Sequence, residues 1–178
     1  MLAIYAVGSS SYSLWLKRLA VVDTVTLAGL YTLRVLAGHA VTGIEYSAWL
    51  NTFCMFTFLS LALMKRVAEL RRAGGTAPGR GYQAEDLPLL AMFGTSSAMV
   101  AMLVFAFYID SSRNAARLYQ HPHLLWLIAP LLATWKMRAW LITWRGAMDS
   151  DPIRFALRDK GSLLTAGLIV LVALAARG

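Results

Sequence analysis

The stretch LPLLAMFGTSSAMVAMLVFAFYI, residues 87–109, contains no charged side chain. A helix needs roughly 20 consecutive apolar residues to cross the hydrocarbon core of a bilayer. Inside lipid, a helix satisfies its own backbone hydrogen bonds, which an isolated extended segment cannot do. Pro88 suits the first turn of such a helix, because the amide it lacks would have no partner there. The stretch is therefore expected to be a membrane-spanning helix, and it sets the class of the protein.

Further apolar blocks lie on both sides of this stretch, as continuous runs and not as a stripe with a 3.6-residue period. They cover residues 1–16, 21–37, 46–64, 122–144 and 162–176. The first block is short, and it is expected to be a short span or the second half of a helix. Pro130 is expected to kink the block that contains it. The chain of 178 residues, 58% of them hydrophobic, is thus expected to be an all-α integral membrane protein with five to six transmembrane helices. We treat residues 1–178 as a single membrane domain.

The basic residues are distributed unevenly between the two ends of these blocks. If successive blocks cross the membrane in alternating directions, only Arg113, Arg117 and Arg177 fall on one side. Arg34 lies within a span. The other basic residues all fall on the opposite side, and these are Lys17, Arg18, Lys65, Arg66, Arg71, Arg72, Arg80, Lys136, Arg138, Arg145, Arg154, Arg158 and Lys160. Cytoplasmic loops are enriched in Lys and Arg, so the loops at 65–86 and 145–160 are expected in the cytoplasm. This bias accounts for the net charge of +8 without nucleic acid.

The first candidate site lies just beyond the block at 46–64. Lys65, Arg66 and Glu69 are expected to continue this helix past the edge of the bilayer. Arg offers a planar fork of donors and Lys a compact charge for a phosphate group, while Glu69 can hold one of the two cations in place. A solvated helix end with cations extended towards water is the alternative.

Tyr82, Glu85 and Asp86 follow in the same loop, immediately before the uncharged stretch. Acidic residues there suit the dipole of the following helix. Alternatively, they bind Mg²⁺ together with a substrate diphosphate, since Mg²⁺ is usually held by one or two carboxylates plus phosphate oxygens. Tyr82 could bind a phosphate or a sugar, or lie at the membrane interface.

The block at 122–144 contains two cations, Lys136 and Arg138, that are expected a turn or two inside the membrane boundary. Such charges usually face a polar cavity or a partner, although they can also extend towards the interface. Arg145 opens the last basic loop. In that loop Asp151 is expected to cap a helix that has Pro152 at its first position, with Asp149 or Asp159 as further acidic residues near the same site. The single Cys54 excludes a disulfide framework and a cysteine metal site.

Several motifs together resemble the UbiA superfamily of intramembrane transferases. They are YSLWLKR at 12–18, Asp23, RVLAG at 34–38, LALMKRVAEL at 61–70 and DPIRFALRD at 151–159. The last two resemble the branch that includes decaprenyl-phosphate phosphoribosyltransferases. The resemblance covers nearly the whole chain. Quinone-forming members have an Asp-x-x-x-Asp motif where this chain has Lys65 to Glu69, which favours the phosphoribosyl branch over aromatic prenylation.

The resemblance implies the C-terminal portion of a nine-helix bundle in a bacterial inner (plasma) membrane. It implies a cytoplasm-facing cavity, Mg²⁺, a diphosphate-bearing donor such as phosphoribosyl or polyprenyl diphosphate, and a lipid or small acceptor. The implied roles are catalytic for Lys65, Arg66 and Glu69, substrate-binding for Tyr82, Lys136, Arg138 and Arg145, and metal-binding for Asp86 and Asp151.

One feature of the family has no counterpart in this sequence, namely the first acidic motif of the Asn/Asp-Asp-x-x-Asp type. Two interpretations follow. The chain is part of a transferase whose N-terminal half lies elsewhere, for example in a partner, or it is a non-catalytic membrane module. Such a module would assemble with a partner subunit or bind anionic lipid through its basic loops.

Overall fold

The computed structural model describes residues 2–42, 46–74, 79–110, 119–148 and 151–178. Within these ranges the chain forms seven α-helices and no strand, as the apolar blocks predicted. The α-helices are α1 (Leu2–Leu14), α2 (Val22–Thr42), α3 (Ala48–Arg72), α4 (Leu87–Asp110), α6 (Ile128–Trp144), α7 (Pro152–Arg158) and α8 (Lys160–Arg177). Three 3₁₀ segments, Leu16–Arg18, Ala84–Asp86 and Pro122–Leu127, lead from or into them.

Within the described ranges, three helical segments are long and apolar enough to cross a membrane, which indicates an integral membrane protein. They are Ala84–Asp110, Pro122–Trp144 and Lys160–Arg177. α2 and α3 are similar in length, at 21 and 25 residues, but they carry charged side chains such as Asp23, Arg34 and Arg66. α3 continues to Arg72, well beyond the apolar block, so the predicted extension through Lys65, Arg66 and Glu69 is confirmed.

The helix boundaries follow local signals in the sequence. Asp151 caps α7 by accepting a hydrogen bond from the amide of Ile153, with Pro152 at the first position, as predicted. A 3₁₀ segment becomes α-helix at Ile128, so Pro130 lies in the first turn of α6, where proline removes no helical hydrogen bond. The kink at Pro130 stays a prediction.

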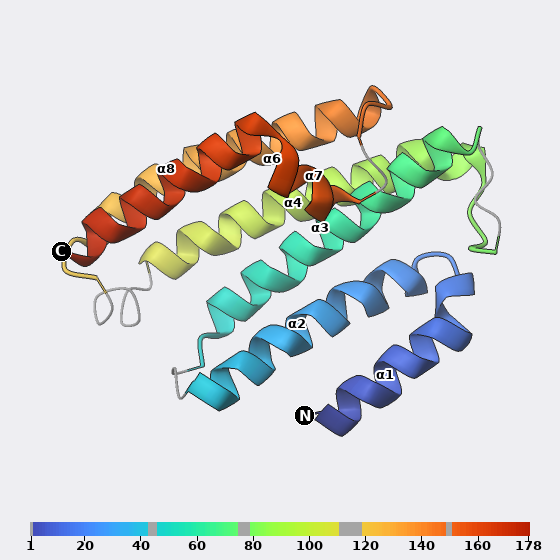
Figure 1. Ribbon diagram of the computed structural model, residues 1–178, viewed down its shortest axis with the longest axis horizontal. Coiled ribbons are helices and arrows are strands. Elements are labelled where there is room, and N and C mark those ends of the chain that lie inside the picture. Colours follow the sequence, from blue (N-terminus) through green and yellow to red (C-terminus); the bar gives the residue numbers. More distant parts are fainter. Residues whose placement is uncertain (1, 43–45, 75–78, 111–118, 149–150) are drawn as a thin grey trace.

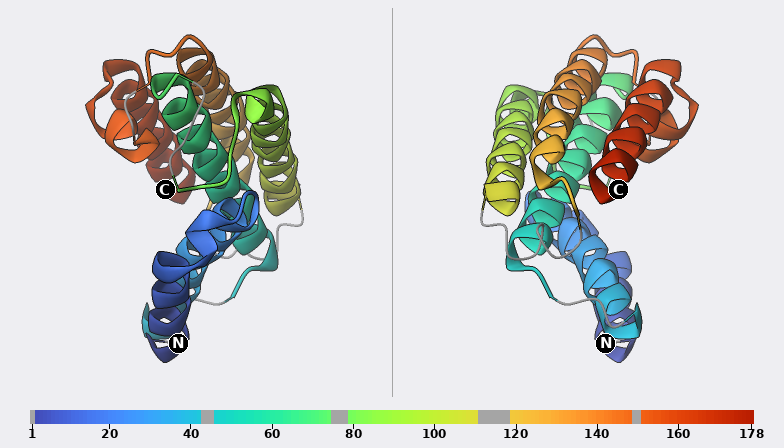
Figure 2. Two further views of the ribbon diagram at one scale, coloured as in Figure 1. Left: turned by 90° about the vertical axis from the view of Figure 1, so that its right-hand side faces the viewer. Right: turned by 90° about the vertical axis from the view of Figure 1, so that its left-hand side faces the viewer.

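The helices α1, α2, α3, α4, α6 and α8 pack side by side in that order (Figure 1). α1 and α2 lie to one side of α3, and α4, α6 and α8 lie to the other (Figure 2). The α1–α2 turn, the end of α3 and the end of α6 all lie at the same end of the bundle. This arrangement agrees with the alternating direction of the predicted spans, and it brings most of the basic residues together.

The core between α3, α4 and α6 depends on a glycine. A Cβ atom at Gly94 would lie 2.2 Å from the ring of Trp140 and 3.1 Å from the Cβ atom of Leu63. Trp140 donates a hydrogen bond to the hydroxyl of Ser60 (3.1 Å), and Ser60 donates to the carbonyl of Gly94 (2.8 Å). The bare backbone of Gly94 thus lets α6 approach α4 closely and fixes the α3–α4–α6 unit beside the basic end.

Candidate functional site

A cavity of about 230 Å³ lies at the basic end of the bundle, between α1, α2, α3 and the start of α7. Its inner wall is apolar and includes the aromatic pair of Tyr31 and Phe58, whose ring centroids are 5.3 Å apart. Its other wall is cationic and is formed by Lys65, Arg66 and Arg80. The cavity therefore has a polar side suited to an anion next to an apolar side.

Arg66 is held by a carboxylate that the sequence did not mark as a site residue. Its Nε atom lies 2.5 Å from Oδ2 of Asp23 on α2, and the two side chains are 1% and 0% exposed. Arg66 also pairs with Glu69 and donates to the hydroxyl of Tyr12 (3.3 Å). A buried charge is tolerated only when it is paired and hydrogen-bonded. This pairing fixes the guanidinium at the wall of the cavity.

Tyr82, in the loop after α3, contacts the same Asp23 carboxylate that holds Arg66. Its hydroxyl donates to Oδ1 of Asp23 and accepts from the amide of Val21 at 2.8 Å. Burial, together with the hydrogen bond to Asp23, raises the pKa of Tyr82 to about 12. The phenol is therefore a neutral donor at ordinary pH. The structure gives Tyr82 the role of fixing Asp23, and Tyr82 does not line the cavity.

Two backbone features hold this loop in place. Val21 has a φ of 68°, a left-handed conformation that is rare for a β-branched residue, and its amide hydrogen bond to Tyr82 stabilises it. Gly81 also has a positive φ, and a Cβ atom there would lie 2.9 Å from the carbonyl oxygen of Arg18. The loop of Gly81 and Tyr82 therefore lies directly on the α1–α2 turn.

Two cations at the cavity have unused capacity to bind an anion. Arg80 is only loosely paired, 3.8 Å from Asp23 and 3.7 Å from Glu69, and its buried Nη1 atom has no hydrogen-bond partner among the described residues. Within the part of the chain that the structure describes, the Lys65 ammonium makes no ion pair. The three cations Lys65, Arg66 and Arg80 are balanced by Asp23, Glu69 and the cap residue Asp151, but Lys65 and Arg80 are not tightly bound by these carboxylates.

Lys136 lies in a different place from the cavity. Its side chain is only 4% exposed, and its ammonium lies 3.1 Å from the hydroxyl of Thr57 and 5.8 Å from the centroid of the Phe53 ring, both on α3. The ammonium is thus directed at α3 inside the protein. The structure does not bring it together with Lys65 and Arg66.

Arg138 and Arg145 also lie away from the cavity. Arg138 pairs with both carboxylate oxygens of Asp159, and its guanidinium packs on Gly161. These hydrogen bonds hold the pKa of Asp159 well below its usual range. Asp159 in turn caps α8 by accepting from the amide of Ser162 at 2.7 Å. Arg138 thus ties α6 to the start of α8, and Arg145 is exposed at the end of α6.

The two predicted metal ligands do not meet. Asp86 accepts a hydrogen bond from the amide of Gln83 at the start of α4. Asp151 lines the cavity but is occupied as the cap of α7. No group of three or more His, Cys, Asp or Glu residues suited to a metal occurs among the described residues. The described residues thus offer no cluster that would bind Mg²⁺ through protein ligands alone, and the metal roles of Asp86 and Asp151 stay predictions. Asp149 lies outside the described residues.

Three residues that contact Arg66 or line the cavity with it were not predicted as site residues, namely Asp23, Arg80 and Tyr12. Asp23 reads as a helix-start charge, Arg80 as one loop cation among several, and Tyr12 as part of an apolar block. The signal that could have found two of them is the resemblance to the UbiA superfamily, because the motifs that carry it include both Tyr12 and Asp23. Arg34, which the sequence placed within a span, has a structural contact instead. It donates to the hydroxyl of Tyr5 and stacks on the rings of Tyr5 and Tyr31, and so joins α1 to α2.

Comparison with curated proteins finds three relatives. The chain is 36% identical over 172 residues to a protein of Sinorhizobium fredii named "Uncharacterized protein y4nM", a match that covers 94% of this chain and 33% of the relative. It is 33% identical over 166 residues to "Nodulation protein NoeC" of Azorhizobium caulinodans, covering 85% of this chain and 52% of the relative. It is 22% identical over 165 residues to "Decaprenyl-phosphate phosphoribosyltransferase" of Mycolicibacterium smegmatis, covering 90% and 52%.

The chain thus spans about a third to a half of the length of these relatives. No family model matches it, and no solved structure is similar to it. The third match shows a distant relation, over nearly the whole chain, to a membrane phosphoribosyltransferase of the UbiA family.

Proposed function

From this distant relation to a membrane phosphoribosyltransferase, we propose that the chain forms the anion-binding part of a UbiA-type transferase. In the proposal, a diphosphate-bearing donor such as phosphoribosyl diphosphate binds in the cavity lined by Lys65, Arg66 and Arg80. The observation that carries the proposal is the convergence of these three cations on one cavity. A lipid or small molecule would accept the transferred group.

The chemistry of the cavity follows from its charges. Group transfer from a diphosphate donor develops negative charge on the departing diphosphate, and fixed cations stabilise that charge. The guanidinium of Arg66 is held in position by Asp23 and Glu69, so it needs little reorganisation. Lys65 and Arg80 supply the donors that are not already used. Glu69 acts in this proposal through the cations it positions.

The relation to UbiA proteins implies a requirement for Mg²⁺, which neutralises diphosphate oxygens when bound. Since no group of three or more possible ligands occurs among the described residues, we propose that further Mg²⁺ ligands come from outside the described residues or from another polypeptide. Because the chain covers only part of its relatives, we propose that an N-terminal partner half completes the enzyme. We also propose that the basic end of the bundle faces the cytoplasm, in keeping with the excess of Lys and Arg there.

Direct binding tests the proposal. Radiolabelled phosphoribosyl diphosphate and a polyprenyl diphosphate would be titrated onto the purified chain in detergent, with and without Mg²⁺. Replacing Arg80 by Gln removes one charge-assisted contact, worth ~1.5–3 kcal/mol, and should weaken binding roughly tenfold or more. Lys65→Ala should act similarly. Arg158→Gln, which removes an exposed cation on α7, is the matched control and should leave the affinity unchanged.

The alternative function is a non-catalytic membrane module. The observation that favours it is that all four carboxylates already have structural partners: Asp23 and Glu69 pair with arginines, and Asp86 and Asp151 accept hydrogen bonds from backbone amides at helix starts. The transferase assignment would be refuted, and the module favoured, if neither donor bound to the chain. This result would have to hold for the chain alone and for the chain co-expressed with an N-terminal half from a relative.

A further inference from the structure

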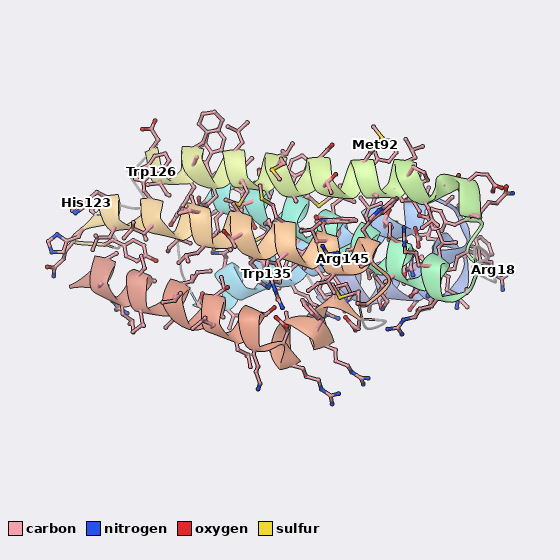
Figure 3. The ribbon with its side chains drawn as sticks, turned by 90° about the horizontal axis from the view of Figure 1, so that it is seen from above. Arg18, Met92, His123, Trp126, Trp135 and Arg145 are labelled. Carbon is pink, nitrogen blue, oxygen red and sulfur yellow. The ribbon has the colours of Figure 1, made fainter. Side chains whose placement is uncertain are left out.

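An apolar groove of about 620 Å³ runs between α4 and α6, apart from the cationic cavity. Its walls include Met92, Met99, Met137, Trp140, Leu141 and Trp144. Figure 3 shows α4 and α6 side by side, with Met92 on α4 and Arg145 at the end of α6. The volume is in the range of pockets that enclose a small organic molecule, and methionine side chains adapt to irregular apolar shapes.

The polar groups at this groove do not face into it. The hydroxyl of Thr95 donates back to the carbonyl of Ala91 within α4 (2.8 Å). The ammonium of Lys136 points to Thr57 on α3, so that Lys136 adds only its aliphatic chain. The groove therefore suits a hydrocarbon chain. Its depth follows from Gly94, because the absence of a side chain there lets the Trp140 ring lie against α4.

The basic end of the groove is charged. Trp144 lines the groove, and the guanidinium of Arg71 lies 4.3 Å from the centroid of its ring. The Nε atom of Arg71 is buried and has no hydrogen-bond partner within the described ranges. Arg145, which follows Trp144 at the end of α6, is exposed. An unsatisfied buried donor in a native protein calls for a partner, and guanidinium groups match phosphate oxygens well.

We propose that this groove binds an anionic phospholipid of the membrane. One acyl chain lies between α4 and α6, and the phosphate accepts hydrogen bonds from Arg71 at the basic end, with Arg145 adding charge. The site is independent of the donor cavity and does not rest on the function proposed above. A lipid bound in the groove contacts the α3–α4–α6 unit, and its binding would stabilise the folded protein.

Photolabelling of the whole chain in lipid nanodiscs tests this proposal. The probe is phosphatidylglycerol with a diazirine at the end of one acyl chain, and the comparison probe is phosphatidylcholine with the same chain. We expect the anionic probe to label peptides of α4 and α6, with unlabelled phosphatidylglycerol competing better than phosphatidylcholine. Arg71→Gln should reduce this labelling about tenfold, the effect of one lost charge-assisted hydrogen bond. Arg158→Gln should leave it unchanged.

A second pair of variants separates the groove from ordinary lipid contact. Thr95→Trp fills the groove and should abolish the labelling, whereas Leu103→Trp, at an exposed position of α4 outside the groove, should not. Labelling spread evenly over all apolar helices, or equal competition by the two lipids in the unmodified protein, would overturn the proposal. So would unchanged labelling in Arg71→Gln, because the site would then not recognise phosphate. The competition measurement needs no variant and stands even if Thr95→Trp fails to fold.

Discussion

Arg66 on α3 and Asp23 on α2 form a buried ion pair across 43 residues of sequence, with 2.5 Å between Nε and Oδ2. Tyr82 donates a hydrogen bond to Asp23, and Glu69 forms a second ion pair with Arg66. The pair lies at the wall of the cavity and joins the α1–α2 part of the bundle to α3. Its integrity should therefore control both stability and anion binding.

Replacing Asp23 by Asn should destabilise the protein by about 1–3 kcal/mol, since the buried guanidinium of Arg66 then keeps only Glu69 of its two counter-charges. The apparent melting temperature in detergent would measure this loss. The double variant Asp23→Asn/Arg66→Gln should recover part of it, because neither charge is then buried alone. If the loss of stability in the double variant, relative to the unmodified protein, equals the sum of the two single losses, the two residues do not interact as described.

The hydroxyl of Tyr82 predicts a loss of stability at high pH. Its folded-state pKa of about 12 lies above the ordinary value of 10, so the folded state holds the proton more tightly. The contribution to stability is complete below pH 10 and is lost as the pH rises from there towards 12. Melting temperatures across this range should fall less steeply in Tyr82→Phe. That variant should also be less stable at neutral pH, by about 1–3 kcal/mol, because the amide of Val21 loses its acceptor. Parallel pH curves for the two proteins would contradict the assignment.

Gly94 should tolerate no side chain. A Cβ atom there would overlap the Trp140 ring at 2.2 Å, so Gly94→Ala must displace that ring from its place against α4. We expect a destabilisation of about 1–3 kcal/mol, as for other overpacked cores, measured as the loss of melting temperature. Gly167→Ala is the matched control, because a Cβ atom at Gly167 meets nothing within 4 Å. That change should stabilise α8 by up to about 1 kcal/mol through helix propensity.

Arg138 should affect stability and not donor binding. Its guanidinium is engaged by Asp159, so Arg138→Gln should lower stability by about 1 kcal/mol or less, given that the pair is partly solvent-screened. Donor affinity should stay as in the unmodified chain, in contrast to Arg80→Gln. A large loss of donor affinity would show that Arg138 reaches the substrate.

The same pair predicts a loss of stability in acid. The lowered pKa of Asp159 means that its contribution is complete above the ordinary value of 3.8 and declines as the pH falls towards the lowered pKa. Arg138→Gln should flatten this decline in a melting-temperature series. If the melting temperature of Arg138→Gln falls with pH as steeply as that of the unmodified protein, another residue causes the loss of stability in acid.

The sequence by itself determined the local features of this protein. The uncharged run at 87–109 is α4 almost to the residue, and the continuous apolar blocks give an all-helical membrane protein. The Asp151–Pro152 cap starts α7 as predicted. Such features follow from hydropathy and capping over a few neighbouring residues, so they can be read along the chain. The basic residues collect at one end because alternating spans return the chain to the same side.

Only the tertiary structure decided which charges meet. Lys136 and Arg138 are two residues apart, yet one is buried against α3 and the other pairs with Asp159, because adjacent positions on a helix face different neighbours. Asp23, Arg66 and Tyr82 come from two helices and a loop, and Gly81 and Val21 allow the loop to reach them. Contacts between distant segments depend on how the helices pack, and no local pattern in the sequence encodes that packing.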